Sequence, residues 1–248
     1  MKNRKVILGI VTDAMFIAIL AVMSFVPYVG FIPLPGTSAT LLHLVVLLGA
    51  FLFGKWRGLL YGTVFGLLSF IKAFSGSSPA DLMFTNPLIS ILPRMLFGFF
   101  SGLAFDIFRK RLKFDNYYKI SSLLAGFFTI FHTFVTLGCL YIFGFKDFLG
   151  ITHAMGHGID GSEITFLAFF GTTTLISASV EIALAFVVVP ALGITIYKAF
   201  GKSRFKEVGL FSFSEEDKIN GDALANIYLL LPAAIVILIG IVQVSLFN

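Results

Sequence analysis

Long apolar segments fill most of this sequence and decide which folds it can form. A helix needs roughly 20 mostly apolar residues to cross a membrane, because each residue advances about 1.5 Å through a hydrocarbon core about 30 Å thick. Breaking the chain at clusters of charged residues, Gly and Pro gives the candidate segments 6–26, 41–53, 58–74, 87–108, 120–143, 166–197 and 224–247. The composition agrees, since 58% of the 248 residues are hydrophobic and only 12% are charged. We therefore predict an all-α integral membrane protein.

The segments divide into a six-helix unit and an appendage. The first is longer than the usual core of a signal peptide, and no small-residue cleavage site follows it, so we expect a retained span. The second has only about 13 residues, so we expect a short or tilted helix sheltered by its neighbours. Residues 1–200 then form a six-helix membrane domain, 201–223 a polar cytoplasmic linker, and 224–248 an additional C-terminal transmembrane helix.

The basic residues gather on one side of this topology. When alternate loops are assigned to the two sides, 15 of the 18 Lys and Arg residues fall together, and the exceptions are Lys72, Arg94 and Lys146. Cytoplasmic loops are enriched in Lys and Arg, so we predict a multi-pass protein of the cell membrane with a cytoplasmic N-terminus. The net charge of +5 therefore reports topology, and we expect no nucleic-acid partner. The single cysteine, Cys139, excludes an internal disulfide.

Small residues recur four positions apart in three segments. Such spacing lines one face of a helix and lets two backbones approach closely in lipid. For the third and fourth segments we expect this packing to be internal, whereas the first segment can offer its face to a separate subunit. The residues are Ala14 and Ala18 in the first segment, Gly58, Gly62 and Gly66 in the third, and Gly98 and Gly102 in the fourth.

Polar side chains lie at the middle or the outer end of the predicted spans. A polar group in hydrocarbon is costly unless it is paired or faces a cavity, so such residues mark functional sites by default. We predict a pocket open to the outside, above dry inner halves. Its candidate substrate-binding residues are His43, Lys72, Asn86, Arg94 and Glu181.

Each of these polar residues also has a simpler interpretation. Arg94 and Lys72 can extend to the outer interface, and Glu181 can neutralise one of them. His132 is expected to be a packing residue whose hydrogen bonds are satisfied, and Asp13 to lie near a helix N-terminus, where a carboxylate suits the dipole. The uncharged loop 28–40 is either a lid over the pocket or an ordinary interfacial loop.

Two motifs have the spacing of known sites without their chemistry. His153 and His157 are four residues apart, but Ala154 replaces the glutamate of a zinc-protease motif, so we expect an outer loop over 145–165 with surface histidines and no metal. The stretch 201–203 ends like a phosphate-binding loop, but Ile196 replaces its upstream glycine. We expect no cofactor and no ATP site in this chain.

Several short motifs follow one another between residues 5 and 199. They are Ala14-Met-Phe-Ile-Ala18, Phe31-Ile-Pro-Leu-Pro, Ala39-Thr-Leu-Leu-His43, Gly49-Ala-Phe-Leu-Phe-Gly54, Gly62-Thr-Val-Phe-Gly66-Leu-Leu-Ser69, Asn86-Pro-Leu-Ile-Ser-Ile-Leu-Pro-Arg94, Gly98-Phe-Phe-Ser-Gly102 and Glu181-Ile-Ala-Leu-Ala-Phe-Val-Val-Val-Pro190. In this order they resemble the substrate-binding S components of energy-coupling factor (ECF) vitamin transporters, and most of all the pantothenate-type branch.

This resemblance implies a fold, a substrate and partners. It implies six helices, a vitamin enclosed near the outer surface beneath the loop between the first two helices, and toppling of the whole subunit during transport. The face with Ala14 and Ala18 would dock on a transmembrane coupling subunit, which works with two ABC-type ATPases. Arg94 with Lys72 would suit a carboxylate such as that of pantothenate. The seventh segment and the long loop 145–165 depart from this plan.

Two other classes of function stay open. One is an intramembrane enzyme that uses His43, His132, Glu181 or the pair His153 and His157, and the other is a vitamin transporter acting alone. An enzyme should place a nucleophile or metal ligands beside a base, and no motif in this sequence demonstrates that arrangement. We therefore expect a binding subunit and no catalytic residues.

Overall fold

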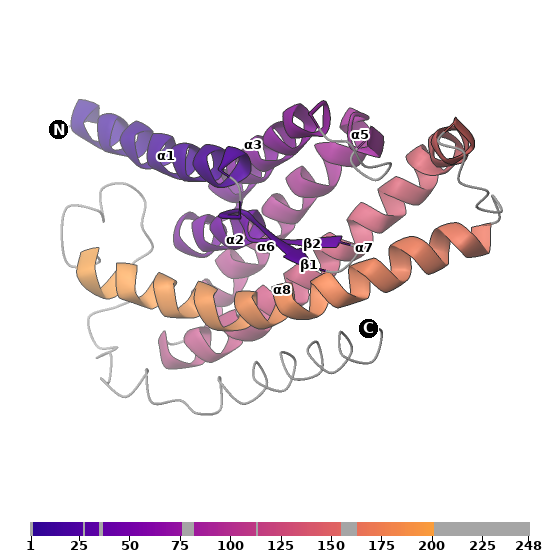
Figure 1. Ribbon diagram of the computed structural model, residues 1–248. Helices are drawn as coiled ribbons and strands as arrows, with labels where there is room; N and C mark the ends of the chain where they lie inside the picture. Colours follow the sequence, from indigo (N-terminus) through magenta and orange to yellow (C-terminus); the bar gives the residue numbers. More distant parts are fainter. Residues whose placement is uncertain are drawn as a thin grey trace.

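The computed structural model describes residues 2–26, 28–34, 37–75, 82–112, 114–154 and 163–200. These residues form a bundle of helices with one short hairpin beside it (Figure 1). The elements are α1 (Lys2–Phe25), β1 (Phe31–Leu34), β2 (Thr37–Thr40), α2 (Leu42–Phe53), α3 (Lys55–Ala73), α5 (Pro87–Ser90), α6 (Leu92–Arg111), α7 (Phe114–Ala154) and α8 (Glu163–Phe200). The chain is an all-α membrane bundle, as predicted.

Within the described ranges, four stretches are long and apolar enough to cross a membrane, fewer than the six predicted for this domain. They are Val6–Phe25, Pro87–Arg111, Asn116–Gly144 and Thr174–Tyr197, within α1, α5 with α6, α7 and α8. The remaining long helix, α3, carries Lys55 and Arg57 at its start and Lys72 in its last turn. The start of α1 and the end of α8 lie on the same side of the bundle (Figure 1), as an even number of crossings requires.

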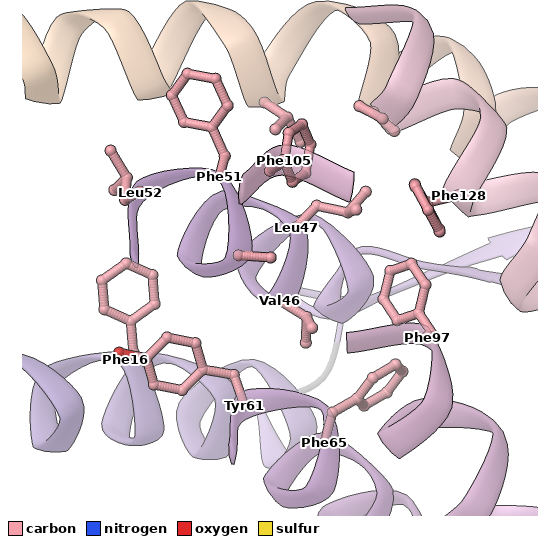
Figure 2. Close-up of a cluster of buried hydrophobic side chains, with 14 of the residues drawn as sticks. Phe16, Val46, Leu47, Phe51, Leu52, Tyr61, Phe65, Phe97, Phe105 and Phe128 are labelled. Carbon is pink, nitrogen blue, oxygen red and sulfur yellow. The ribbon is translucent and has the colours of Figure 1, made fainter. Parts of the chain in front are cut away.

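The short helix α2 is the centre of the bundle. It has 12 residues, eight of which are buried, and it contacts α1, α3, α6 and α8. Figure 2 shows Val46, Leu47 and Phe51 of α2 surrounded by aromatic side chains from the neighbouring helices. This burial confirms the expectation of a short sheltered helix, because a helix too short to meet water at both ends is stable only inside protein.

Glycines bring α3 and α6 together, and this pair has the most extensive contact between described elements. A Cβ atom added to Gly62 would lie 2.3 Å from the carbonyl oxygen of Arg94, and one added to Gly58 would lie 2.3 Å from that of Gly98. No side chain larger than hydrogen fits at these distances. The third and fourth segments therefore pack internally through their small residues, as predicted.

Asp13 does not have the role expected from the sequence. It lies in the middle of α1, three turns from the start, where a helix dipole acts weakly. Its Oδ1 atom lies 2.8 Å from Nε of Arg57 and accepts a hydrogen bond of 2.7 Å from the Tyr61 hydroxyl. The carboxylate therefore joins α1 to α3, and a second ion pair joins Asp106 and Arg109. The sequence predicted no such paired charges within this half of the bundle.

The predicted outer loop over 145–165 is wrong at both ends. Helix α7 continues to Ala154 and α8 begins at Glu163, because helical hydrogen bonds do not require apolar side chains once the chain leaves the hydrocarbon. His153 lies in the last turn of α7. His157, the stretch 201–203, the predicted linker and the predicted seventh span lie outside the described residues.

Replacing Gly62 with Ala tests the contact between α3 and α6. We expect the variant to be destabilised by about 1–3 kcal/mol, because the added methyl group forces the two backbones apart. Gly138→Ala in α7 is the matched control, since an added Cβ there meets nothing within 4 Å. Thermal unfolding in detergent measures both variants, and equal melting temperatures would contradict the proposed packing.

Candidate functional site

Arg94 is a buried cation in the first turn of α6. Arg94 is 7% exposed, and its Nη1 atom donates a hydrogen bond of 2.7 Å to the carbonyl oxygen of Ile89. The guanidinium carbon lies 5.7 Å from the centre of the Phe65 ring and 4.9 Å from that of Phe84. Two aromatic faces and one carbonyl hold the group in place, and no carboxylate of the described residues forms an ion pair with it.

The described residues give Arg94 no ion-pair partner within 4.0 Å. Glu181 is close enough to interact electrostatically with it, but the two groups do not meet. The Nε atom of Arg94 is buried and has no hydrogen-bond partner among the described residues. A buried charge is costly unless it is paired, so the structure has the features of a site for an anion.

Glu181 anchors the hairpin that follows α1. Its Oε1 atom accepts a hydrogen bond of 2.7 Å from the backbone N–H of Thr40, and β2 packs against α8. Thr40 pairs with Phe31 at the open end of the hairpin. The predicted uncharged lid is therefore a hairpin tied to α8 (Figure 1). Glu181 interacts electrostatically with Arg94 but forms no ion pair with it, and its carboxylate instead accepts the hydrogen bond from the Thr40 N–H.

His43 and His132 lie next to each other in the interior. His43 is completely buried and His132 is 4% exposed. Their ring centres are 6.4 Å apart with an angle of 11° between the planes. No ring nitrogen of either residue makes a well-formed hydrogen bond to a described residue, although the backbones of Thr40 and Glu181 lie close to His43. The sequence interpretation of His132 as a satisfied packing residue is therefore wrong.

Aromatic rings connect the histidines to Arg94. The His132 ring centre lies 5.9 Å from that of Phe65 and 4.9 Å from that of Phe97. Phe65 therefore contacts both the Arg94 guanidinium and the His132 ring. Figure 2 shows Phe65 and Phe97 facing each other at one end of the apolar cluster. The polar site begins where this cluster ends.

The other two candidate residues are less central. Asn86 is the N-cap of α5, where its side chain accepts a hydrogen bond of 3.0 Å from the backbone N–H of Leu88. It therefore helps to position Ile89, the residue that binds Arg94. Lys72 is half-buried in the last turn of α3, about two turns beyond Phe65. Of the five candidates, the structure gathers His43, Arg94 and Glu181.

An apolar groove lies elsewhere on the bundle and does not suit a charged ligand. It has a volume of about 210 Å³ and is lined by Met23, Leu41, Leu44, Val45, Leu48, Val188, Val189 and Leu192. The described residues also contain no group of three or more His, Cys, Asp and Glu side chains that could hold a metal ion.

The face of α1 that carries Ala14 and Ala18 points away from the bundle. Both alanines are exposed, and so are Met15 and Val22, at 52% and 57%. Only 17% of the most apolar window of this span is buried inside the protein. This face is therefore available to lipid or to another protein.

Comparison with known proteins places the chain among transport proteins. Residues 9–193 match the family described as ECF transporter, substrate-specific component. The chain is 30% identical over 192 residues to the pantothenate transporter PanT of Leuconostoc mesenteroides. The aligned region covers 74% of this chain and 92% of the relative. It is 32% identical over 115 residues to the pantothenic acid transporter PanT of Lactococcus lactis, covering 40% of this chain and 58% of the relative.

Substitutions of Glu181 test the anchor of the hairpin. Glu181→Leu removes the acceptor for the Thr40 N–H, and we expect amide hydrogen exchange at Thr40 to accelerate about fivefold, since a hydrogen bond contributes about 1 kcal/mol. Glu181→Gln keeps an oxygen acceptor and should change the exchange rate much less. Mass spectrometry of the 37–40 region measures this, and identical exchange in the two variants would count against the anchor.

Proposed function

The chain belongs to the family of ECF transporter substrate-specific components, and on this premise we propose that it binds pantothenate, or a related small anionic vitamin, with high affinity for ATP-driven uptake. The relatives named above are pantothenate transporters. Both the family and these relatives serve transport, which fits a protein that is not an enzyme.

The unneutralised buried charge of Arg94 carries this proposal. A guanidinium group binds a carboxylate through two parallel hydrogen bonds, and such charge-assisted bonds are about twice as strong as neutral ones. The unpaired Nε atom of Arg94 is one donor suited to this contact. Phe65 and Phe84 beside it supply apolar walls that strengthen the attraction by excluding water.

We place the site in the outer half of the membrane, with the N-terminus in the cytoplasm. The excess of basic residues on the side where α1 begins supports this orientation. The hairpin of β1 and β2 then lies on the outer part of the bundle, tied to α8 by Glu181. In this arrangement the hairpin acts as a lid over the bound vitamin, and the protein resides in the cell membrane.

We further propose that α1 docks on a transmembrane coupling subunit that works with two ABC-type ATPases. Ala14 and Ala18 lie one turn apart on the exposed face of α1. Two small side chains at this spacing let a partner helix approach closely in lipid. The ion pair of Asp13 with Arg57 holds the opposite side of α1 against the bundle, so the small-residue face stays directed outward.

Arg94→Gln tests the carboxylate site. We expect the affinity of the purified protein for pantothenate to fall at least about 100-fold, because a charged ligand group loses its buried partner. Arg111→Gln, which removes an exposed arginine from the same helix, should leave the affinity unchanged. Calorimetric titration measures both variants, with pantothenol, the alcohol analogue, as a second ligand.

Two results would separate the possible failures of this proposal. Equal loss of affinity for pantothenate and pantothenol in Arg94→Gln would show that Arg94 does not read the carboxylate. If the natural protein fails to bind pantothenate but binds another anionic vitamin, the substrate assignment changes and the role of Arg94 is tested with that vitamin.

Bulky residues at Ala14 and Ala18 test the docking face. We expect Ala14→Trp combined with Ala18→Trp to prevent co-purification with the coupling subunit and ATPases, because the large rings hold the helices apart, while pantothenate binding is retained. Leu123→Trp on the lipid-exposed side of α7, where Leu123 is 62% exposed, is the control. Normal assembly of the double variant would exclude this face, and vitamin uptake by the chain alone would favour a solitary transporter.

A further inference from the structure

The two central histidines present hydrogen-bonding atoms that the described protein does not use. His43 comes from α2 and His132 from α7, and each is more than nine-tenths buried. None of their four ring nitrogens makes a well-formed hydrogen bond to a described residue, although the backbones of Thr40 and Glu181 lie close to His43. Leaving buried polar groups unpaired is unfavourable, so the arrangement calls for a ligand that supplies the missing partners.

The chemistry of imidazole limits what this ligand group can be. A neutral imidazole has one N–H donor and one acceptor nitrogen. A pair of such rings therefore suits a group that both donates and accepts, such as a hydroxyl or an amide. The described residues add no third ligand that would make the pair a metal site. A carboxylate is better served by Arg94, which has donors and no acceptor.

The positions of the two subsites relate them to one ligand. Arg94 and His132 contact the same Phe65 ring, at 5.7 and 5.9 Å from its centre. His43 stacks against His132 and follows Thr40 by three positions in the chain. The Thr40 hydroxyl is also buried without a partner among the described residues. A small molecule with a charged end and an uncharged polar end can therefore reach both Arg94 and the histidines.

We propose that His43 and His132 form an uncharged polar subsite that hydrogen-bonds a hydroxyl or amide group of the vitamin whose carboxylate binds Arg94. The inference rests on the proposed function and adds the basis of specificity. Arg94 selects the charge of the ligand, and the histidine pair selects the polar groups at its other end. Small fatty acids of similar size, which have the carboxylate alone, are rejected because they leave the histidines unpaired.

A cycle of one substitution and two ligands tests this subsite. His132→Phe keeps a planar ring against Phe65 and Phe97 but removes both nitrogens. The ligands are pantothenate and its analogue without the two hydroxyl groups, each titrated into purified protein. We expect the substitution to weaken pantothenate binding at least about tenfold and to weaken binding of the analogue much less. His43→Phe should give the same pattern.

The control is another buried polar residue of α7. Thr129 is completely buried, but its hydroxyl already donates a hydrogen bond of 2.9 Å to the Ala125 carbonyl, so Thr129→Val should not alter the preference between the ligands. If His132→Phe weakens both ligands equally, or weakens neither, the subsite is refuted while the carboxylate site at Arg94 stands. If the natural protein binds neither these ligands nor any other anionic vitamin, the proposed function fails and this inference fails with it.

Discussion

The close contact between α3 and α6 is the constraint on which the site depends. Gly62 approaches the carbonyl of Arg94 so closely that only hydrogen fits between them, and Gly66 approaches Ile91 in the same way. These contacts set the height and rotation of α6 against α3. Because Phe65 lies between Gly62 and Gly66 on α3, the packing that joins the helices also brings the Phe65 ring against the Arg94 guanidinium.

The polar site is assembled around this pair by elements distant in the sequence. Helix α2 supplies His43, α7 supplies His132, and α8 supplies Glu181, which also ties the hairpin to the bundle. Short α2 makes this possible, because it lies inside the bundle and can be reached from several sides. A site built from so many elements is sensitive to their relative positions. Movement of one helix would therefore change the geometry of the site.

Buried polar groups are paired with one another in one region of the protein and lack partners among the described residues in another. Between the middle of α1 and the first half of α3, Asp13, Arg57 and Tyr61 satisfy one another and hold the two helices together. At the other end, Arg94 and the two histidines keep atoms without partners among the described residues. Satisfied polar groups add to structure, whereas unsatisfied buried ones mark a place for a ligand. The same residue types thus serve packing in one region and, as we propose, recognition in the other.

The sequence by itself determined the class of fold and the approximate positions of several helices. Apolar runs that end at charged residues, Gly or Pro predict α1, α2 and α6 to within a few residues, and glycine spacing predicts the contact of α3 with α6. Only the tertiary structure decided which polar residues meet. His132 has no local signal that distinguishes packing from binding, and Asp13 finds its partners 44 and 48 positions away in Arg57 and Tyr61. Such pairings arise from the crossing of helices, and no periodicity within a single helix records them.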